Sequence, residues 1–120
     1  MKVKVASTAG FCMGVRRAVN IALDSARDRP APVATLGSLI HNPQVVAMLE
    51  RRGVSVVSGP PDSGTVVIRS HGVPPDVRAE LKAKGLSVVD ATCPRVARVH
   101  GIVRSQRKKG ALVVVLGDAG

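Results

Sequence analysis

The sequence predicts an α/β protein built on a parallel sheet with alternating helices. Short valine-rich runs alternate along the chain with segments whose apolar residues recur at helical spacing. The valine-rich runs are apolar at nearly every position, which is typical of strands that are covered on both faces. Glycine or proline marks most of the boundaries between the two kinds of segment. A chain of 120 residues is long enough for one modest domain with its own core.

Six segments are predicted to be strands because they are short and rich in β-branched residues. They are Lys2–Ala6, Val33–Leu36, Val54–Val57, Thr65–Ser70, Ser87–Asp90 and Ala111–Leu116.

Four helices are predicted between these strands. In Gly14–Arg27, apolar residues fall on one face: Val15, Ala18, Val19, Ala22 and Ala26. The second helix begins after Asn42 as N-cap, with Pro43 in its first position, and closes at Gly53. The third runs from Pro75 to Gly85, and the fourth is a long basic helix from Pro94 to Gly110.

Composition and charge narrow the possible functions. The hydrophobic content of 45% favours a folded chain over a disordered one. The formal net charge of +10 predicts attraction to anions, such as nucleic acid, an anionic membrane or a phosphorylated metabolite. No apolar run approaches the length of a membrane span, and Met1–Ala9 lacks the apolar core of a signal peptide. We therefore expect a cytoplasmic protein in which Cys12 and Cys93 are reduced thiols.

Four reactive side chains share one kind of position in this pattern. Cys12, His41, His71 and Cys93 each follow a predicted strand and precede a predicted helix. In a parallel sheet these turns lie at the carboxyl ends of the strands, where open α/β folds bind ligands. The four side chains are therefore predicted to converge along one edge, beside helix N-termini that favour anions.

Each of these residues also has a simpler interpretation. A single cysteine is often a small buried hydrophobe, but two in equivalent turns favour thiolate ligands near helix N-termini. Gly10 and Gly14 flank Cys12 and permit close backbone approach. A third histidine, His100, lies inside the last helix and is assigned a structural role. The paired basic residues are assigned to solvated helix faces: Arg16 with Arg17, Arg51 with Arg52, and Lys108 with Lys109.

Four segments carry a specific resemblance. Ala9–Ala18 and Asp90–Pro94 resemble the first two cysteine motifs of the 4-hydroxy-3-methylbut-2-enyl diphosphate reductase family. Ile40–Pro43 and Ser70–Val73 are similar to its histidine motifs. All four occur in the family's order across the whole chain, so the resemblance is specific although no single motif would be.

The resemblance implies an iron–sulfur enzyme. The family carries a 4Fe–4S cluster held by three cysteines, with one iron open to the substrate. Cys12 and Cys93 would be two of these ligands, and His41 and His71 would bind the diphosphate of the substrate. The implied reaction is reductive loss of the allylic hydroxyl, which yields isopentenyl and dimethylallyl diphosphate. A ferredoxin or flavodoxin is the implied electron donor, with neither nucleic acid nor a membrane as partner.

Two features of the family pattern are missing from this sequence: the third cysteine and the catalytic glutamate. The family's third cysteine has no counterpart here, since the sequence holds two cysteines. Residues 117–120 resemble the start of the family's next motif, whose catalytic glutamate is expected beyond Gly120.

The family folds as three similar α/β units. Residues 14–93 would form the first and 94–120 the start of the second, while the strand and cysteine turn of 1–13 would pair with the third. Alone, the chain is expected to be inactive and to hold no stable cluster.

The sequence is also compatible with three other functions. The basic segment Arg95–Lys109 is compatible with nucleic-acid binding, although Phe11 is the only aromatic residue available for base stacking. Cys12, His41, His71 and Cys93 could form a zinc site or take part in thiol chemistry, but their spacing is unlike a standard zinc motif. A shortened paralogue with a binding role is the third alternative.

Overall fold

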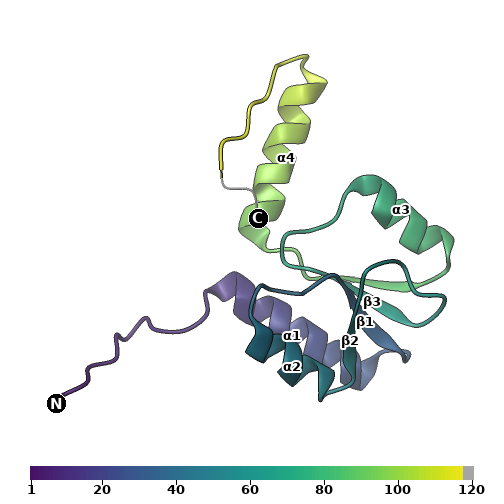
Figure 1. Ribbon diagram of the computed structural model, residues 1–120. Helices are drawn as coiled ribbons and strands as arrows, with labels where there is room; N and C mark the ends of the chain where they lie inside the picture. Colours follow the sequence, from purple (N-terminus) through teal and green to yellow (C-terminus); the bar gives the residue numbers. More distant parts are fainter. Residues whose placement is uncertain (118–120) are drawn as a thin grey trace.

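The computed structural model describes residues 1–117, in which helices and strands alternate as predicted except between β2 and β3, which a loop connects (Figure 1). The elements are α1 (Met13–Asp28), β1 (Val33–Leu36), α2 (Pro43–Glu50), β2 (Val54–Val57), β3 (Thr65–Ile68), α3 (Pro75–Ala83), β4 (Ser87–Asp90) and α4 (Pro94–Lys108).

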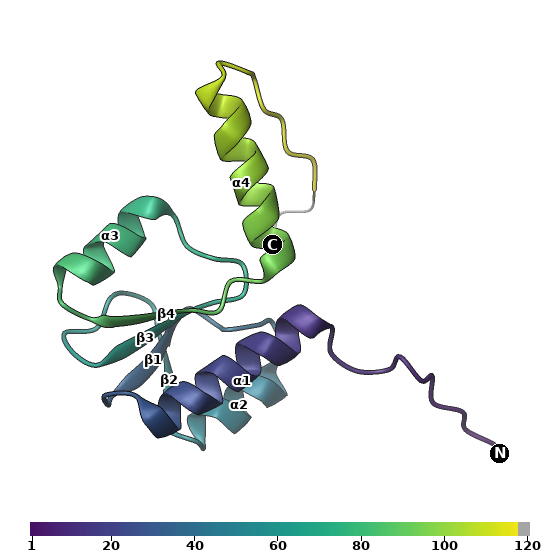
Figure 2. The ribbon, with the colours of Figure 1, turned by 180° about the vertical axis from the view of Figure 1, so that it is seen from behind.

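The four strands form one parallel sheet in the order β2-β1-β3-β4, which confirms the predicted fold class. Val33 of β1 is in register with Val54 of β2 and with Thr65 of β3. The chain leaves β1 through α2 to reach β2, and it leaves β3 through α3 to reach β4. Figure 2 shows α2 and α3 on opposite faces of the sheet. The crevice at the carboxyl ends of β1 and β3 is therefore a topological switch point, the usual place for a ligand in this class.

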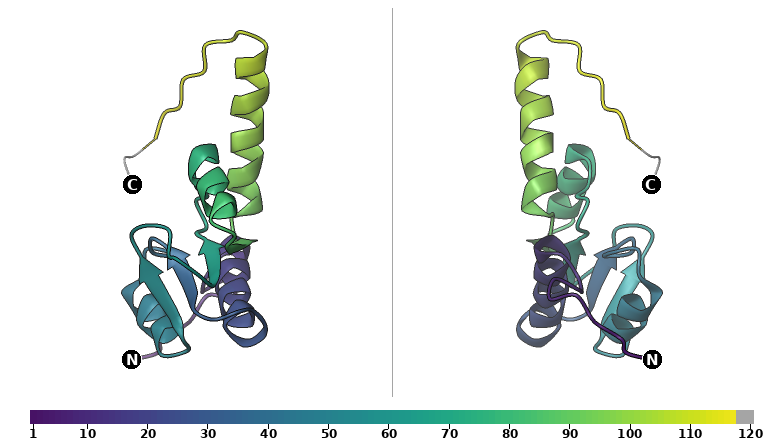
Figure 3. Two further views of the ribbon diagram at one scale, coloured as in Figure 1. Left: turned by 90° about the vertical axis from the view of Figure 1, so that its right-hand side faces the viewer. Right: turned by 90° about the vertical axis from the view of Figure 1, so that its left-hand side faces the viewer.

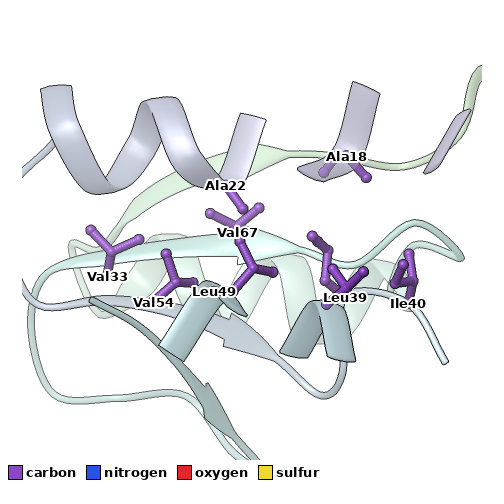
Figure 4. Close-up of a cluster of buried hydrophobic side chains, with 10 residues drawn as sticks. Ala18, Ala22, Val33, Leu39, Ile40, Leu49, Val54 and Val67 are labelled. Carbon is purple, nitrogen blue, oxygen red and sulfur yellow. The ribbon is translucent and has the colours of Figure 1, made fainter. Parts of the chain in front are cut away.

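Apolar side chains pack on both faces of the sheet. The larger core lies under α1 and α2 and includes Ala18, Ala22, Leu49 and Val67 (Figure 4). The opposite face holds a smaller cluster of Val66, Leu81 and Leu86 under α3. Val66 and Val67 are both fully buried and point to opposite faces, because side chains alternate along a strand. This two-sided burial is the reason why the strands have no polar face.

The predicted helix boundaries are confirmed within a few residues. The side-chain oxygen of Asn42 accepts a hydrogen bond of 3.1 Å from the backbone N–H of Val45, as an N-cap does. Pro43 occupies the first turn of α2, as predicted. Gly85 has a φ of 71°, in the left-handed region where glycine ends a helix at least cost. The apolar face predicted for the first helix is the face of α1 that packs on the core.

Two predicted strands are wrong for the described residues. Lys2–Ala6 and the described segment Ala111–Leu116 form no ladder. The strand predicted at Thr65–Ser70 is present as β3, but it ends at Ile68. A strand needs a hydrogen-bonded neighbour, and residues 1–117 supply none to these two segments. Of the motif expected at 117–120, only Gly117 lies within the described residues.

Helix α4 and the segment after it extend away from the sheet (Figure 3). No residue of α4 is buried. The radius of gyration is 16.6 Å, compared with about 14 Å for a compact domain of this length. The extended N-terminal segment and α4 account for this difference. None of the helices in the described part of the chain is long and apolar enough to cross a bilayer.

Candidate functional site

The two cysteines occupy equivalent places at the starts of two helices. Cys12 is the N-cap residue of α1, and Cys93 is the N-cap residue of α4. A Cβ atom built on Gly14 would lie 2.6 Å from the Sγ of Cys93 and 3.9 Å from the Sγ of Cys12. Both sulfurs therefore lie beside the same backbone atom, although 80 residues separate them in the sequence. The predicted convergence of the thiols is present in the structure.

The surroundings of Cys12 favour the thiolate. The pKa of its exposed thiol is below the usual value, chiefly because the backbone N–H of Val15 stabilises the charged sulfur. Partial desolvation opposes this effect, while the Gly14 N–H and the charges of Arg95 and Arg16 reinforce it. A lowered thiol pKa at a helix N-terminus is typical of cysteines that bind metals or react as nucleophiles.

The two histidines also meet. The rings of His41 and His71 are stacked, with centroids 5.3 Å apart and planes inclined by 24°. His41 lies between β1 and α2, and His71 follows β3, so the pair stands at the switch point of the sheet. Both side chains are exposed to solvent. Imidazole N–H groups in this position can donate hydrogen bonds to an anion.

Backbone hydrogen bonds centred on Ser70 tie the turns together. The N–H of Ser70 donates to the carbonyl of Leu39, over 3.2 Å, and the N–H of Cys93 donates to the carbonyl of Ser70, over 2.8 Å. The pairing of the central strands thus continues past their assigned ends, into the turns that carry His41, His71 and Cys93. Ser70 is 5% exposed, so this link is shielded from water. Ser70 belongs to one of the histidine motifs, but the sequence pattern does not predict that its backbone connects the turns after β1 and β4.

A basic residue assigned to a solvated face also contributes. Arg17 of α1 donates a hydrogen bond of 3.1 Å from Nη1 to the carbonyl of Thr92, the residue before Cys93. Arg17 is exposed, as expected of a solvated helix face, but it also makes this contact. Its guanidinium holds the start of α1 against the turn that positions the second thiol. Helical spacing alone could not reveal this contact, because the acceptor is 75 residues away.

The thiol pair and the imidazole pair are two separate groups. Within residues 1–117, no three cysteine, histidine or acidic side chains lie close enough together to hold one metal ion. A zinc site made of all four residues is therefore not supported by the geometry. The thiol pair suits a soft metal or an iron–sulfur centre, and the imidazole pair suits an anionic group.

This geometry defines a class: a parallel α/β protein with paired thiols and paired imidazoles at the carboxyl edge of its sheet. Residues 3–120 match the family described as LytB protein, and the chain belongs to that family. It is 51% identical over 120 residues to the 4-hydroxy-3-methylbut-2-enyl diphosphate reductase of Dehalococcoides mccartyi (strain CBDB1), covering 98% of this chain and 42% of the relative. The 4-hydroxy-3-methylbut-2-enyl diphosphate reductase of Aquifex aeolicus (strain VF5) is 46% identical over 116 residues. This match covers 95% of this chain and 40% of the relative.

Solved structures agree with this assignment. The fold is similar to that of an (E)-4-hydroxy-3-methyl-but-2-enyl diphosphate reductase, the terminal enzyme of the non-mevalonate pathway, with a TM-score of 0.83 and 44% identity. That match covers 97% of this chain and 42% of the other. The E-1-hydroxy-2-methyl-but-2-enyl-4-diphosphate reductase from Plasmodium falciparum gives a TM-score of 0.78 at 30% identity. This match covers 86% of this chain and 33% of the other. The chain thus spans less than half the length of these relatives.

Proposed function

We propose that this chain is the N-terminal portion of a 4-hydroxy-3-methylbut-2-enyl diphosphate reductase, in which it contributes two cluster ligands and two diphosphate-binding histidines. The observation that carries the proposal is the meeting of the Cys12 and Cys93 sulfurs beside Gly14. Two thiolates at helix N-termini, brought together from distant positions in the sequence, match part of the donor set of an iron–sulfur cluster.

Cys12 and Cys93 would hold two irons of a 4Fe–4S cluster, which supplies electrons to the substrate when bound. The family's ligand set requires a third thiolate, and this sequence has no further cysteine to provide it. Arg17 keeps Thr92 and Cys93 in place, and the positive charges of Arg16 and Arg95 help to stabilise the thiolate of Cys12. The chain alone would therefore provide an incomplete ligand set.

His41 and His71 would hold the diphosphate of the substrate. Their stacked rings stand at the switch point, and imidazole N–H groups donate well to phosphate oxygens. Such contacts compensate a highly charged group for the water it loses on binding. With two electrons from the donor and two protons, the allylic hydroxyl would leave as water, which would yield isopentenyl and dimethylallyl diphosphate.

The remainder of the proposal concerns the longer protein. Residues 14–93 would form one α/β unit and 94–120 the start of a second, while 1–13 would pair with a third unit. The exposed apolar side chains of Val3, Val5, Leu112 and Leu116 support this division, since each is more than 70% accessible. A reducing, cytoplasmic setting would keep the exposed Cys12 as a thiol. A ferredoxin or flavodoxin would supply the electrons.

A chimeric enzyme tests the proposal. Residues 1–120 of this chain replace the matching segment of the Dehalococcoides mccartyi reductase, which is 51% identical to it. The chimera is reconstituted anaerobically with iron and sulfide and is assayed with reduced methyl viologen. We expect both diphosphate products to form. Cys12→Ser and Cys93→Ser should each lower the activity at least about 100-fold, a loss of roughly 3 kcal/mol in transition-state stabilisation.

The histidine variants separate substrate binding from cluster assembly. His41→Ala and His71→Ala should raise KM and retain the iron content, whereas the cysteine variants should lose iron. Arg51→Ala is the matched control, because Arg51 is exposed and lies outside the site. Full activity and full iron content in the Cys93→Ser chimera would refute the proposal.

A further inference from the structure

A small cavity lies behind the candidate site, between α3, the end of β4 and α4. Its volume is about 160 Å³. Three basic side chains line it: Arg78 from α3, and His100 and Arg104 from α4. The sequence pattern does not predict this cluster, since it indicates only a basic helix with His100 in a structural role.

The charges that face this cavity do not cancel. Arg78 forms an ion pair of 2.6 Å with Asp90, the acidic residue of the lining. Arg104 has no ion-pair partner within residues 1–117. Two guanidinium groups and an imidazole thus face one carboxylate, so the cavity has a net positive charge before any ligand enters. Guanidinium forks match the oxygens of a tetrahedral anion.

We infer that this cavity is an anion site for a single phosphate or diphosphate group, separate from the pair of His41 and His71. The size sets the ligand class, because pockets for drug-sized molecules have volumes of about 300–1,000 Å³. A nucleotide base or an isoprenoid chain would have to remain outside. Arg104 is the principal ligand, with His100 and the partly engaged Arg78 completing the set.

The walls of the cavity connect it to the candidate site. Gly72 and Thr92 both line it, and they are the immediate neighbours of His71 and Cys93. His100 Cε1 lies 3.2 Å and Thr92 Oγ1 lies 3.3 Å from the place where a Cβ on Gly72 would stand. A bound anion would therefore touch the rear of both turns. The role of His100 is larger than structural, since it joins the anion to the turn that carries His71.

The test uses the full chain in solution, followed by NMR of its backbone amides, arginine side chains and imidazoles. Inorganic phosphate and inorganic diphosphate are titrated separately, and potassium chloride at the same ionic strength measures general screening of the +10 charge. We expect saturable shifts at Gly72, Arg78, Thr92, His100 and Arg104. Adenosine monophosphate should bind no more tightly than phosphate, since its base finds no room.

Variants assign the site. Arg104→Gln should weaken binding about tenfold, the usual loss for one charge-assisted hydrogen bond, and Arg104→Gln with His100→Gln should abolish it. Arg107→Gln is the control, because Arg107 lies on the same helix but outside the cavity. The inference is overturned by shifts that match those in chloride, or by equal effects of Arg104→Gln and Arg107→Gln.

The two anion sites give different signals. Saturation confined to His41 and His71 would support the proposed diphosphate site and overturn the one described here. Saturation confined to the signals of His100 and Arg104 would support the cavity as the anion site and would overturn the proposed diphosphate site at His41 and His71.

Discussion

The sulfur of Cys93 occupies the space that a side chain at position 14 would fill. A Cβ on Gly14 would approach it to 2.6 Å, a distance that real Cβ atoms essentially never show. Gly14 lies within α1 and has no positive φ, so its backbone would accept any residue. Space for the thiol is therefore the reason for glycine at this position.

Gly14→Ala should drive the two sulfurs apart. The added methyl group displaces the Cys93 side chain, and overpacking of this kind costs about 1–3 kcal/mol. We expect the yield of cross-linking between Cys12 and Cys93 by dibromobimane, which fluoresces on joining two nearby thiols, to fall severalfold.

Gly101→Ala in α4 is the control, because a Cβ there meets nothing within 4 Å. It should leave the cross-link intact and add up to about 1 kcal/mol of helix stability. Equal cross-linking in the two alanine variants would contradict the steric role of Gly14.

Cys12 should be the faster of the two thiols to react near neutral pH. Its pKa is lowered chiefly by the Val15 N–H, against partial desolvation and with help from the Gly14 N–H, Arg95 and Arg16. A lower pKa means a larger thiolate fraction at a given pH, so the rate of alkylation by iodoacetamide should rise at lower pH than for an ordinary thiol.

Removing a nearby charge should move that profile. Arg95→Gln is expected to shift the midpoint of the Cys12 profile upward, and Arg98→Gln, which is not among the groups acting on Cys12, should not. The rate of each thiol is followed by peptide mass spectrometry. A Cys12 profile that is unchanged by Arg95→Gln would show that the backbone alone sets the pKa.

Much of the fold follows from local signals. Asn42 with Pro43, and Gly85 after the third helix, mark boundaries whose backbone geometry few other residues satisfy. Valine-rich runs gave all four strands of the sheet. Lys2–Ala6 and Ala111–Leu116 look the same locally but form no strand in residues 1–117, because pairing depends on a neighbour that a local pattern cannot supply.

The residues of the candidate site could be predicted from the sequence, but the hydrogen bonds that link their turns could not. His41, His71 and Cys93 lie at strand-to-helix turns, as predicted. Cys12 lies at the start of α1 without the strand predicted before it. The contact of Arg17 with Thr92 and the role of Ser70 between two turns depend on strand order. The order β2-β1-β3-β4 results from packing over the whole sheet, and no segment of the sequence encodes it alone.

Asp90 should make the stability of the chain depend on pH. Burial raises the pKa of this carboxyl, but hydrogen bonds from Thr92 and the ion pair with Arg78 outweigh it, so the pKa is below its usual value. A depressed carboxyl pKa contributes stability that is complete above the unfolded-state pKa and is lost as the pH falls through the folded-state value.

Asp90→Asn should therefore destabilise the chain at neutral pH and converge with the wild type in acid. About 1 kcal/mol is expected at neutral pH, because the pair is partly exposed and screened by solvent. Urea unfolding across the acid range gives the comparison, with Asp62→Asn as the control, because Asp62 is exposed and forms no ion pair within residues 1–117. A stability difference that stays constant with pH would show that the charge of Asp90 contributes nothing.

Gly64 is the position where a single methyl group should damage the sheet most. Its φ is +95°, and a Cβ there would collide with the carbonyl oxygen of Pro32. That same oxygen accepts a hydrogen bond of 2.8 Å from the N–H of Thr65, while the Gly64 carbonyl accepts one of 3.1 Å from Ser87. Both bonds align the starts of neighbouring strands, so the collision would separate β3 from β1 and disturb β4.

Gly64→Ala should lower the free energy of unfolding by about 3 kcal/mol or more, since backbone strain, a steric clash and lost hydrogen bonds act together. Gly59→Ala, in the same loop, meets nothing within 4 Å and has no positive φ, so it should change stability by less than about 1 kcal/mol. Urea midpoints from circular dichroism give the comparison, and complete loss of the transition in Gly64→Ala alone agrees with the prediction. Equal midpoints for the two variants would mean that the contact between Gly64 and Pro32 does not align these strands.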